Sequence, residues 1–194
     1  MKAAREVWFD QFADVPISDL VFIDEFGAST SMTRLYGRAP KGERVVDKVP
    51  GGRWSIVSTI AALTSRGIVA SASFVGATDS SLFLTFVREA LVPVLRPGQI
   101  VILDNLSAHK LPGVRELIES ANCRLILLPP YSPDLNPIEQ AISKIKTLLR
   151  SEGKREIDAL IRAIARATAQ VTPQDAMGFI GDSGYVATGR CKAL

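Results

Sequence analysis

The sequence predicts an α/β fold in which helices cover the faces of a mixed sheet. The first observation is the order of the segments, because three strand-like segments come first and helical and strand-like segments then alternate. The second is the length, since 194 residues suit one ordinary domain. The third is the composition, in which 47% hydrophobic and 22% charged residues match the globular average.

A meander of three strands forms the first half of the predicted fold. The run 20–26 is apolar, includes β-branched residues and stops at Gly27, which predicts a buried strand. Segments 54–63 and 68–75 are separated by the turn residues 64–67 and predict a hairpin. Segment 34–53 is basic and contains several glycines and prolines, so we expect strand and loop there rather than helix.

Helices and strands alternate in the second half of the chain. Apolar residues recur at helical spacing between Asp79 and Leu95, where Thr78 or Asp79 can cap the helix start. The rest of the chain predicts, in this order, strand 100–104, helix 112–121, strand 123–128, a proline-rich loop 129–137, helix 138–150 and a helix near 154–170. Together with the meander, this order indicates a mixed sheet with helices on its faces.

The composition excludes several classes of protein. No apolar run approaches the roughly 20 residues that span a bilayer, and the first residues lack the apolar core of a signal peptide. Two cysteines are too few for a disulfide framework, so we expect a reduced, cytoplasmic protein. The single histidine, His109, excludes sites with several histidine ligands and leaves carboxylates to hold any metal. The net charge of +3 permits a polyanionic partner.

Two aspartates stand out because each lies in or at the end of a strongly apolar strand. Asp24 is inside the first predicted strand, and Asp104 ends the strand 100–104. A buried aspartate is costly unless it is paired or metal-bound, although an aspartate at a strand end often only caps the next turn. Two carboxylates about 4 Å apart repel by about 4 kcal/mol at an effective dielectric constant of 20. A divalent cation between them removes this repulsion, and oxygen ligands favour Mg²⁺ or Mn²⁺ over Zn²⁺.

A third acid, Glu139, has two interpretations. In the first it is structural, because Asn136 as N-cap, Pro137 at the first helical position and Glu139 at the third form a variant of the capping box. The second interpretation depends on the preceding loop, which contains four prolines and is stiffer than a cap requires. Such a loop fixes the direction in which the helix start and its carboxylate point.

Three segments carry a resemblance to a known family. They are Phe22-Ile23-Asp24-Glu25, then Leu103-Asp104-Asn105 with Ser107-Ala108-His109, and the segment PPYSPDLNPIE over 129–139. Together they resemble the catalytic core of mariner-like DDE transposases, most closely the bacterial insertion-sequence branch of the Tc/mariner-like superfamily. Segments 36–42 and 183–185 are also similar, so the resemblance covers roughly residues 20–185. Glu139 follows Asp104 by 35 positions, a spacing that this group uses.

The resemblance implies a fold, an activity and a set of site residues. The implied fold is ribonuclease H-like, with a five-stranded mixed sheet flanked by helices. Asp24, Asp104 and Glu139 match the three catalytic acids of the family, which implies a site for two Mg²⁺ ions, or Mn²⁺ as substitute, beside a scissile phosphate. The implied function is Mg²⁺-dependent DNA strand cleavage and strand transfer in DNA transposition.

The resemblance also implies partners and a domain organisation. DNA is the expected substrate, both as transposon ends and as target, with a homodimer or higher assembly on DNA at the bacterial nucleoid. Full-length members begin with helix-turn-helix modules that this chain lacks, so we expect a separate polypeptide to supply them. The catalytic domain is expected over 20–185, after a short lead-in over 1–19 and before a tail over 186–194.

Positive charges are the candidate DNA contacts. The stretch 34–53 has few acids and has glycines that allow close approach, whereas the basic face of the helix that begins at 138 can equally be a solvated face. Trp54 could stack on a base, but we expect it in the core beside a strand. The candidate residues are Arg34, Arg38, Lys41, Arg44, Lys48, Arg53, Lys144 and Lys146.

Two other functions stay open at the level of the sequence. A truncated transposase fragment without catalytic activity could act as an oligomerisation or inhibitory partner of a full-length enzyme. A ribonuclease H-type nuclease would prefer RNA–DNA hybrids, but the sequence contains no clear reader of the 2′-hydroxyl group. Both alternatives share the predicted fold and differ from the transposase in activity.

Overall fold

A single mixed sheet organises the molecule. The computed structural model describes residues 7–12, 14–104, 112–130 and 132–185. Within this part of the chain the sheet has five strands in the order β3–β2–β1–β4–β5. The first three strands pair antiparallel, and β4 and β5 run parallel to β1. The strands are β1 (Leu20–Ser29), β2 (Ile56–Thr64), β3 (Gly67–Val75), β4 (Ile100–Leu103) and β5 (Arg124–Leu127).

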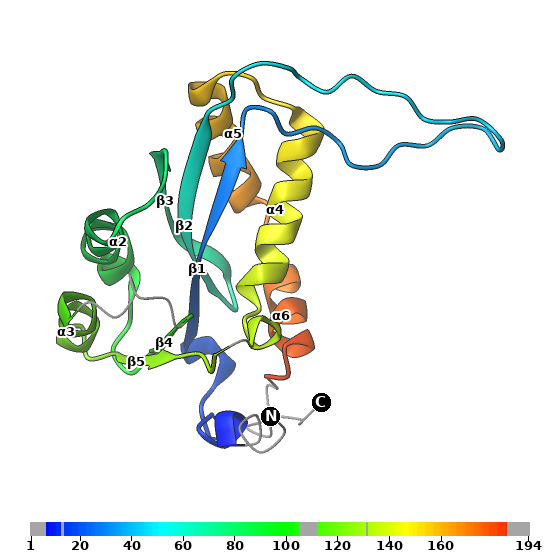
Figure 1. Cartoon of the computed structure of the whole chain (residues 1–194). Helices are drawn as coiled ribbons and strands as arrows, with labels where there is room; N and C mark the ends of the chain where they lie inside the picture. Colours follow the sequence, from blue (N-terminus) through cyan, green and yellow to red (C-terminus); the bar gives the residue numbers. More distant parts are fainter. Residues whose placement is uncertain (1–6, 13, 105–111, 131, 186–194) are drawn as a thin grey trace.

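Helices cover both faces of the sheet, as the sequence predicted (Figure 1). On one face lie α4 (Ile138–Glu152), α5 (Ile157–Ala169) and α6 (Pro173–Asp182), and on the other lie α2 (Ser80–Phe86) and α3 (Pro112–Ser120). Short helical turns precede β1 and α4, namely η1 (Ile17–Asp19) and η5 (Pro133–Leu135). Among the described residues, no helix combines the length and the apolar character that a membrane crossing requires.

The central strand β1 is apolar along most of its length because both of its faces are buried. Leu20, Phe22 and Phe26 face the core beneath α4, α5 and α6. Val21 and Ile23 alternate with them and face the second core, beneath α2 and α3. The alternation places Asp24 on the same face as Phe22 and Phe26, so its carboxylate points toward the side of the sheet that α4 covers.

The helix predicted over 79–95 forms in three pieces. Asp79 caps it as expected, because its Oδ1 accepts hydrogen bonds from the backbone N–H groups of Ser81 and Leu82, each at 2.9 Å. The α-helix α2 then widens into the π turn η2 (Val87–Leu91) and tightens into the 3₁₀ turn η3 (Val92–Val94). Pro93 accounts for the break, because it has no N–H to donate to the carbonyl one turn before it.

Helix α6 was not predicted from the sequence. Its start carries a complete capping box, in which the hydroxyl of Thr172 accepts from the N–H of Asp175 and the carboxylate of Asp175 accepts from the N–H of Thr172. Pro173 stands at the first helical position. Threonine, proline and an acid at this spacing are the signal that could have identified the helix.

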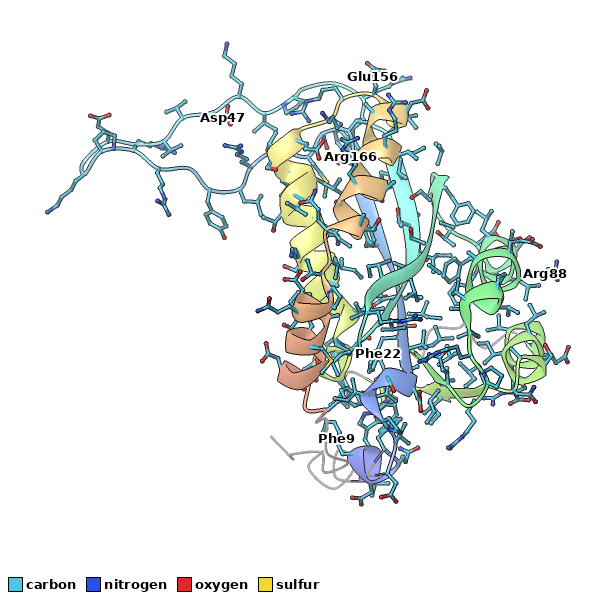
Figure 2. All side chains as sticks on the ribbon, turned by 180° about the vertical axis from the view of Figure 1, so that it is seen from behind. Phe9, Phe22, Asp47, Arg88, Glu156 and Arg166 are labelled. Atoms are coloured by element: carbon cyan, nitrogen blue, oxygen red, sulfur yellow. The ribbon has the colours of Figure 1, made fainter. Side chains whose placement is uncertain are left out.

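The two ends of the described chain meet in the core. Trp8, Phe9 and Phe12 are buried among the same residues as Phe22 of β1, and Figure 2 shows Phe9 in the short helix near the N-terminus, at the Phe22 end of the sheet. The rings of Phe9, Phe12 and Phe22 each pack edge-on against the ring of Tyr185. The segment expected as a lead-in therefore contributes to the core of the domain, whose boundary at residue 20 remains a prediction.

Candidate active site

Asp24 is a buried carboxylate in the middle of the sheet. Its side chain is 9% exposed, between two phenylalanines of the same strand face. The carboxylate Oδ1 accepts the backbone N–H of Glu25 at 2.7 Å, and Oδ2 accepts the side-chain Nδ2–H of Asn136 at 2.9 Å. A carboxylate inside an apolar strand is thus held by specific donors, which fixes the direction of its two oxygens.

The parallel pairing of β1 and β4 brings Asp104 to the level of Asp24. Ile23 is in register with Leu103, and each aspartate is the next residue along its strand. Neighbouring strands lie about 4.8 Å apart, so these two backbone positions are adjacent. The sequence predicts that the two strands bring these acids together, and the register agrees with that expectation.

The loop between β5 and α4 contacts Asp24 on the face of the sheet that α4 covers. Asn136 is 3% exposed, and its side chain donates to Asp24 instead of capping α4. The N-cap of α4 is Pro137, with no side-chain hydrogen bond, so the capping-box interpretation of Asn136, Pro137 and Glu139 is wrong. The amide is turned toward a buried carboxylate 112 positions away in sequence, to which its Nδ2–H donates, and its Oδ1 accepts no N–H from the first turn of α4.

A second contact anchors the same loop one residue earlier. The hydroxyl of Tyr185 donates to the carbonyl of Leu135 at 2.9 Å and accepts the Nε1–H of Trp8 at 3.0 Å. Tyr185 is 1% exposed, and Leu135 is fully buried. The family resemblance includes segment 183–185 but does not predict this role of Tyr185. A lone tyrosine after a helix end carries no local signal for a partner 50 positions away.

Glu139 lies in the first turn of α4, with an exposed side chain. Its backbone N–H donates to the carbonyl of Asn136 at 3.1 Å, so the helix start is tied to the residue that contacts Asp24. Within the described residues, no three Asp, Glu, His or Cys side chains come close enough together to hold a metal ion. The structure therefore brings Asp24 and Asp104 to one level of the sheet, and it places Glu139 one turn beyond Asn136.

Some positions that carry the family resemblance have no described location. Asn105, Ser107, Ala108, His109 and Tyr131 lie outside the described residues.

Six of the eight candidate DNA contacts lie on one projecting segment. Residues 30–55, between β1 and β2, leave the body of the molecule as a long extended loop (Figure 1), here called the arm, and Asp47 marks its projecting part in Figure 2. The arm contains no helix or strand of the sheet. Tyr36 is 89% exposed there. The arm residues are Arg34, Arg38, Lys41, Arg44, Lys48 and Arg53.

The structure corrects the expected position of Trp54. Its side chain is 61% exposed, at the base of the arm and before β2 begins, instead of packed in the core. It lines a pocket with arm residues and with Arg155, whose guanidinium donates to the carbonyls of Thr30 and Met32, each at 2.8 Å. The arm is therefore fixed at its base, beside the turn between α4 and α5.

Helix α4 contributes the two remaining candidates. Lys144 forms an ion pair with Asp175 of α6, and Lys146 lies half-buried on the same helix. The Lys144 ammonium and the hydrogen bonds from Thr172 lower the pKa of Asp175 from its ordinary 3.8 to about 2. Next to this helix, the arm borders a pocket of about 280 Å³ that is lined by Arg34, Leu35, Tyr36, Thr147, Arg150 and Ser151.

Solved structures of a mariner transposase share this architecture. The Mos1 mariner paired end complex with Mn has a TM-score of 0.76 and 16% identity, over 94% of this chain and 57% of that chain. The catalytic domain of Mos1 mariner transposase has a TM-score of 0.61 and 15% identity, over 95% of this chain and 93% of that domain. This chain thus spans little more than half of the Mos1 chain in that complex, and nearly all of the catalytic domain. The expected ribonuclease H-like fold is confirmed.

A family comparison agrees with the fold. No curated protein matches the chain. The family model of the DDE superfamily endonucleases, by contrast, matches residues 19–161, well over half of the chain, including Asp24, Asp104 and Glu139. The match and the shared fold agree with the Tc/mariner-like resemblance found in the sequence. The chain belongs to the DDE superfamily of endonucleases.

Proposed function

We propose that this chain is the catalytic domain of a Tc/mariner-like transposase that cuts and joins DNA strands, with Asp24, Asp104 and Glu139 as its catalytic acids. One observation carries the proposal: the buried Asp24 carboxylate shares its level of the sheet with Asp104 and is hydrogen-bonded to the loop that leads into Glu139. Three acids from distant parts of the sequence are thereby linked through one buried contact and one strand pair.

The residues fit a divalent metal site. The donor set is made of carboxylates, and hard oxygen ligands suit Mg²⁺ and Mn²⁺. Asn136 adds a buried side-chain oxygen, Oδ1, that has no hydrogen-bond partner within the described residues. Asp24, Asp104 and Glu139 are the residues that would hold the ions, two per site. When bound, such ions activate a water or a DNA 3′-hydroxyl for attack on phosphate and stabilise the leaving oxygen.

Different elements of the fold hold the three acids. Asp24 is fixed on the central strand, with both carboxylate oxygens engaged by donors. Asp104 follows the neighbouring strand, so sheet pairing holds the two acids in place relative to each other. Glu139 belongs to a different element, the start of α4, and its position depends on the loop before it. The site therefore combines two paired strands inside the sheet with a helix start that separate contacts hold in place.

The test is DNA nicking by the purified chain with Mn²⁺ or Mg²⁺. We expect the wild type to relax supercoiled plasmid, and we expect Asp24→Asn, Asp104→Asn and Glu139→Gln each to reduce the rate by about 10³-fold or more, as loss of a metal ligand does. Glu25→Gln is the matched control, because Glu25 is next to Asp24 but on the opposite face of β1.

Stability separates a metal site from a structural role in the same experiment. Asp104→Asn should leave the melting temperature unchanged or raise it, because it removes repulsion between neighbouring carboxylates. A large loss of stability in Asp104→Asn, or nicking that survives all three substitutions, contradicts the proposal.

The proposed partner is DNA, as transposon ends and as target. The six basic arm residues support it, because they lie on an exposed projection with room for a phosphate backbone. The Mos1 relatives were solved as a paired end complex and as a strand transfer complex. We propose a corresponding homodimer or higher assembly on DNA in this protein, with the helix-turn-helix module supplied by a separate polypeptide and with the bacterial nucleoid as its location.

One observation favours the second candidate, a non-catalytic partner of a full-length transposase. The described residues do not gather three metal-ligating side chains in one place. A chain that binds transposase or DNA but shows no metal-dependent nicking at any Mn²⁺ concentration would support this candidate. The nicking assay therefore distinguishes the two functions directly.

A further inference from the structure

We propose that Asn136 is a positioning residue of this site. Its side-chain amide holds the Asp24 carboxylate and couples it to the turn that carries Glu139. The inference deepens the proposed function and rests on it, since it assigns a role toward the acids that would bind the metal.

The contact itself has a defined direction. An ionised carboxylate accepts hydrogen bonds and cannot donate, so the Nδ2 of Asn136, rather than its Oδ1, must face the Oδ2 of Asp24. The N–H of Glu25 donates to the other oxygen, Oδ1, so each carboxylate oxygen receives a donor. These donors set the rotation of the carboxyl group.

Asn136 is held firmly on both sides. Before it, the buried Leu135 is fixed through its carbonyl by the hydroxyl of Tyr185, which the indole of Trp8 contacts in turn. After it, Pro137 restricts the backbone and is the N-cap of α4. The amide of Asn136 therefore cannot shift without disturbing a buried hydrogen-bond chain that reaches the first and last described segments of the protein.

The same residue connects the two parts of the site. The carbonyl of Asn136 accepts the N–H of Glu139, while its side chain donates to Asp24. Backbone and side chain of one residue thus link the helix start to the central strand. A change at Asn136 should alter the relative placement of Asp24 and Glu139, whereas a change in the later turns of α4 should not.

The unpartnered end of the amide supports a role at the site. Its Oδ1 is buried and lacks a hydrogen-bond donor within the described residues. Buried polar atoms in a purely structural position are ordinarily satisfied at both ends. The Nδ2–H of Asn136 bonds the Asp24 carboxylate, while the Oδ1 of the same amide has no partner within the described residues. Partners that orient metal-binding carboxylates in this way commonly change metal affinity about 10- to 100-fold when removed.

The test uses three variants of the full chain. Asn136→Ala removes the amide, and Asn136→Leu removes it while it keeps nearly the same volume and packing. Ile145→Ala is the matched control, because Ile145 is fully buried on α4, the helix that follows Asn136. Each protein is titrated with Mn²⁺, with binding followed by the electron paramagnetic resonance of free Mn²⁺, with and without a DNA duplex. The Mn²⁺ concentration for half-maximal plasmid nicking and the melting temperature are measured in parallel.

A positioning role predicts that metal affinity and stability separate. Both Asn136 variants should need at least about 10-fold more Mn²⁺ than the wild type for half-saturation. Asn136→Leu should nevertheless melt within a few degrees of the wild type. Ile145→Ala should melt at a clearly lower temperature and keep the wild-type Mn²⁺ requirement. Saturating Mn²⁺ should restore more of the nicking rate in the Asn136 variants than in Asp24→Asn.

Three outcomes overturn the inference. The first is a Mn²⁺ requirement within twofold of the wild type in Asn136→Leu. The second is an Asn136→Leu chain that fails to fold while Ile145→Ala folds, because the amide is then structural. In both cases wild-type nicking leaves the proposed function intact. The third is a wild type that neither binds Mn²⁺ nor nicks DNA, which overturns the proposed function and this inference together.

Discussion

Two long connections of this molecule differ sharply although both contain prolines and little regular structure. The arm over 30–55 joins β1 to β2 and projects from the body (Figure 1). The loop over 128–137 joins β5 to α4, and its residues 135–137 are buried against the sheet. The arm offers positive charge to the outside, whereas the loop delivers side chains to the buried Asp24.

The difference follows from how each backbone is held. The loop has anchors along its length: Leu128 donates to Leu103, the carbonyl of Leu135 accepts from Tyr185, and Asn136 donates to Asp24. The arm is held at its base, where Thr30 and Ser55 pair through their backbones, and by contacts of Arg155. Stiffness at a site therefore comes from buried anchors and not from proline alone.

The largest effect on stability is expected at Gly184, which directly precedes Tyr185, the residue that anchors the loop. Gly184 has a φ of +95° and ends α6 in a Schellman motif, in which its N–H donates to Gly181 and that of Tyr185 donates to Ile180. A Cβ at Gly184 would lie 2.7 Å from the Phe9 ring. We expect Gly184→Ala to lower the free energy of unfolding by about 3 kcal/mol or more, from left-handed strain and overpacking.

Urea unfolding measures this effect, and the same helix offers its control. A Cβ at Gly181 meets nothing within 4 Å. Gly181→Ala should therefore stabilise the protein slightly, by about 0.5–1 kcal/mol, because alanine favours a helix. Equal stability of the two variants would show that the turn before Tyr185 does not anchor the loop.

A smaller loss is expected when only the anchoring hydroxyl is removed. Tyr185→Phe takes away the hydroxyl that bonds the Leu135 carbonyl and the Trp8 indole N–H in the core. We expect a loss of about 1–2 kcal/mol in the free energy of unfolding, measured by urea titration. Tyr36→Phe makes the same chemical change on the exposed arm and should leave stability unchanged. A similar loss in both variants would contradict the contrast between the two connections.

Changes in the arm should affect DNA binding and spare the fold. Replacing Arg38, Lys41 and Arg44 by alanine should change the free energy of unfolding by less than about 0.5 kcal/mol. It should weaken DNA binding and reduce the slope of log K against log salt by up to about 3, because each phosphate that a cation neutralises contributes about 0.9 to that slope. Binding is measured by fluorescence anisotropy across a salt series.

The matched control removes three exposed arginines from the other side of the molecule, where Figure 2 labels Arg88. The triple variant of Arg88, Arg115 and Arg124 removes the same charge, and all three are exposed. Its salt slope should equal that of the wild type. Equal slopes for both triple variants and the wild type would remove the arm from the DNA interface.

The smallest effect concerns pH. Because the pKa of Asp175 falls from 3.8 to about 2 in the folded protein, its interactions with Lys144 and Thr172 stabilise the fold above about pH 4 and lose this effect as the pH falls toward 2. The difference in melting temperature between the wild type and Asp175→Asn should be a few degrees at most above about pH 5 and should shrink below about pH 4. Asp47→Asn on the arm is the control. A difference that stays constant down to about pH 2 would contradict the linkage.

Local patterns predicted most elements because they report burial directly. The alternating and continuous apolar runs predicted all five strands, and β1 extends three residues further than expected because it continues to pair with β2. The apolar spacing over 79–95 correctly predicts helical structure, but it does not predict the break at Pro93. Asp24 and Asp104 could be identified because a carboxylate in an apolar strand is costly to bury without a partner.

Side-chain partners were harder to predict than elements. Trp54 was expected in the core because tryptophan is usually buried, but it precedes the strand and lies outside the core. Asn136 was expected to cap a helix, since its spacing to Glu139 fits a cap, and it bonds Asp24 instead. For Asn136, a carboxylate far away in sequence determines the actual partner. For Trp54, the side chain lies where the folded chain provides no core to bury it.

Neighbours within a few positions specify the strands and most of the helices, and they mark Asp24 and Asp104 as acids in apolar strands, so these features can be predicted from the sequence alone. Folding in three dimensions is needed to establish that Asn136 contacts Asp24, that Trp8 meets Tyr185 and that the arm stands clear of the body. The first two contacts join residues 112 and 177 positions apart. Such pairs form only when the chain has folded around a common core, so no local pattern can specify them.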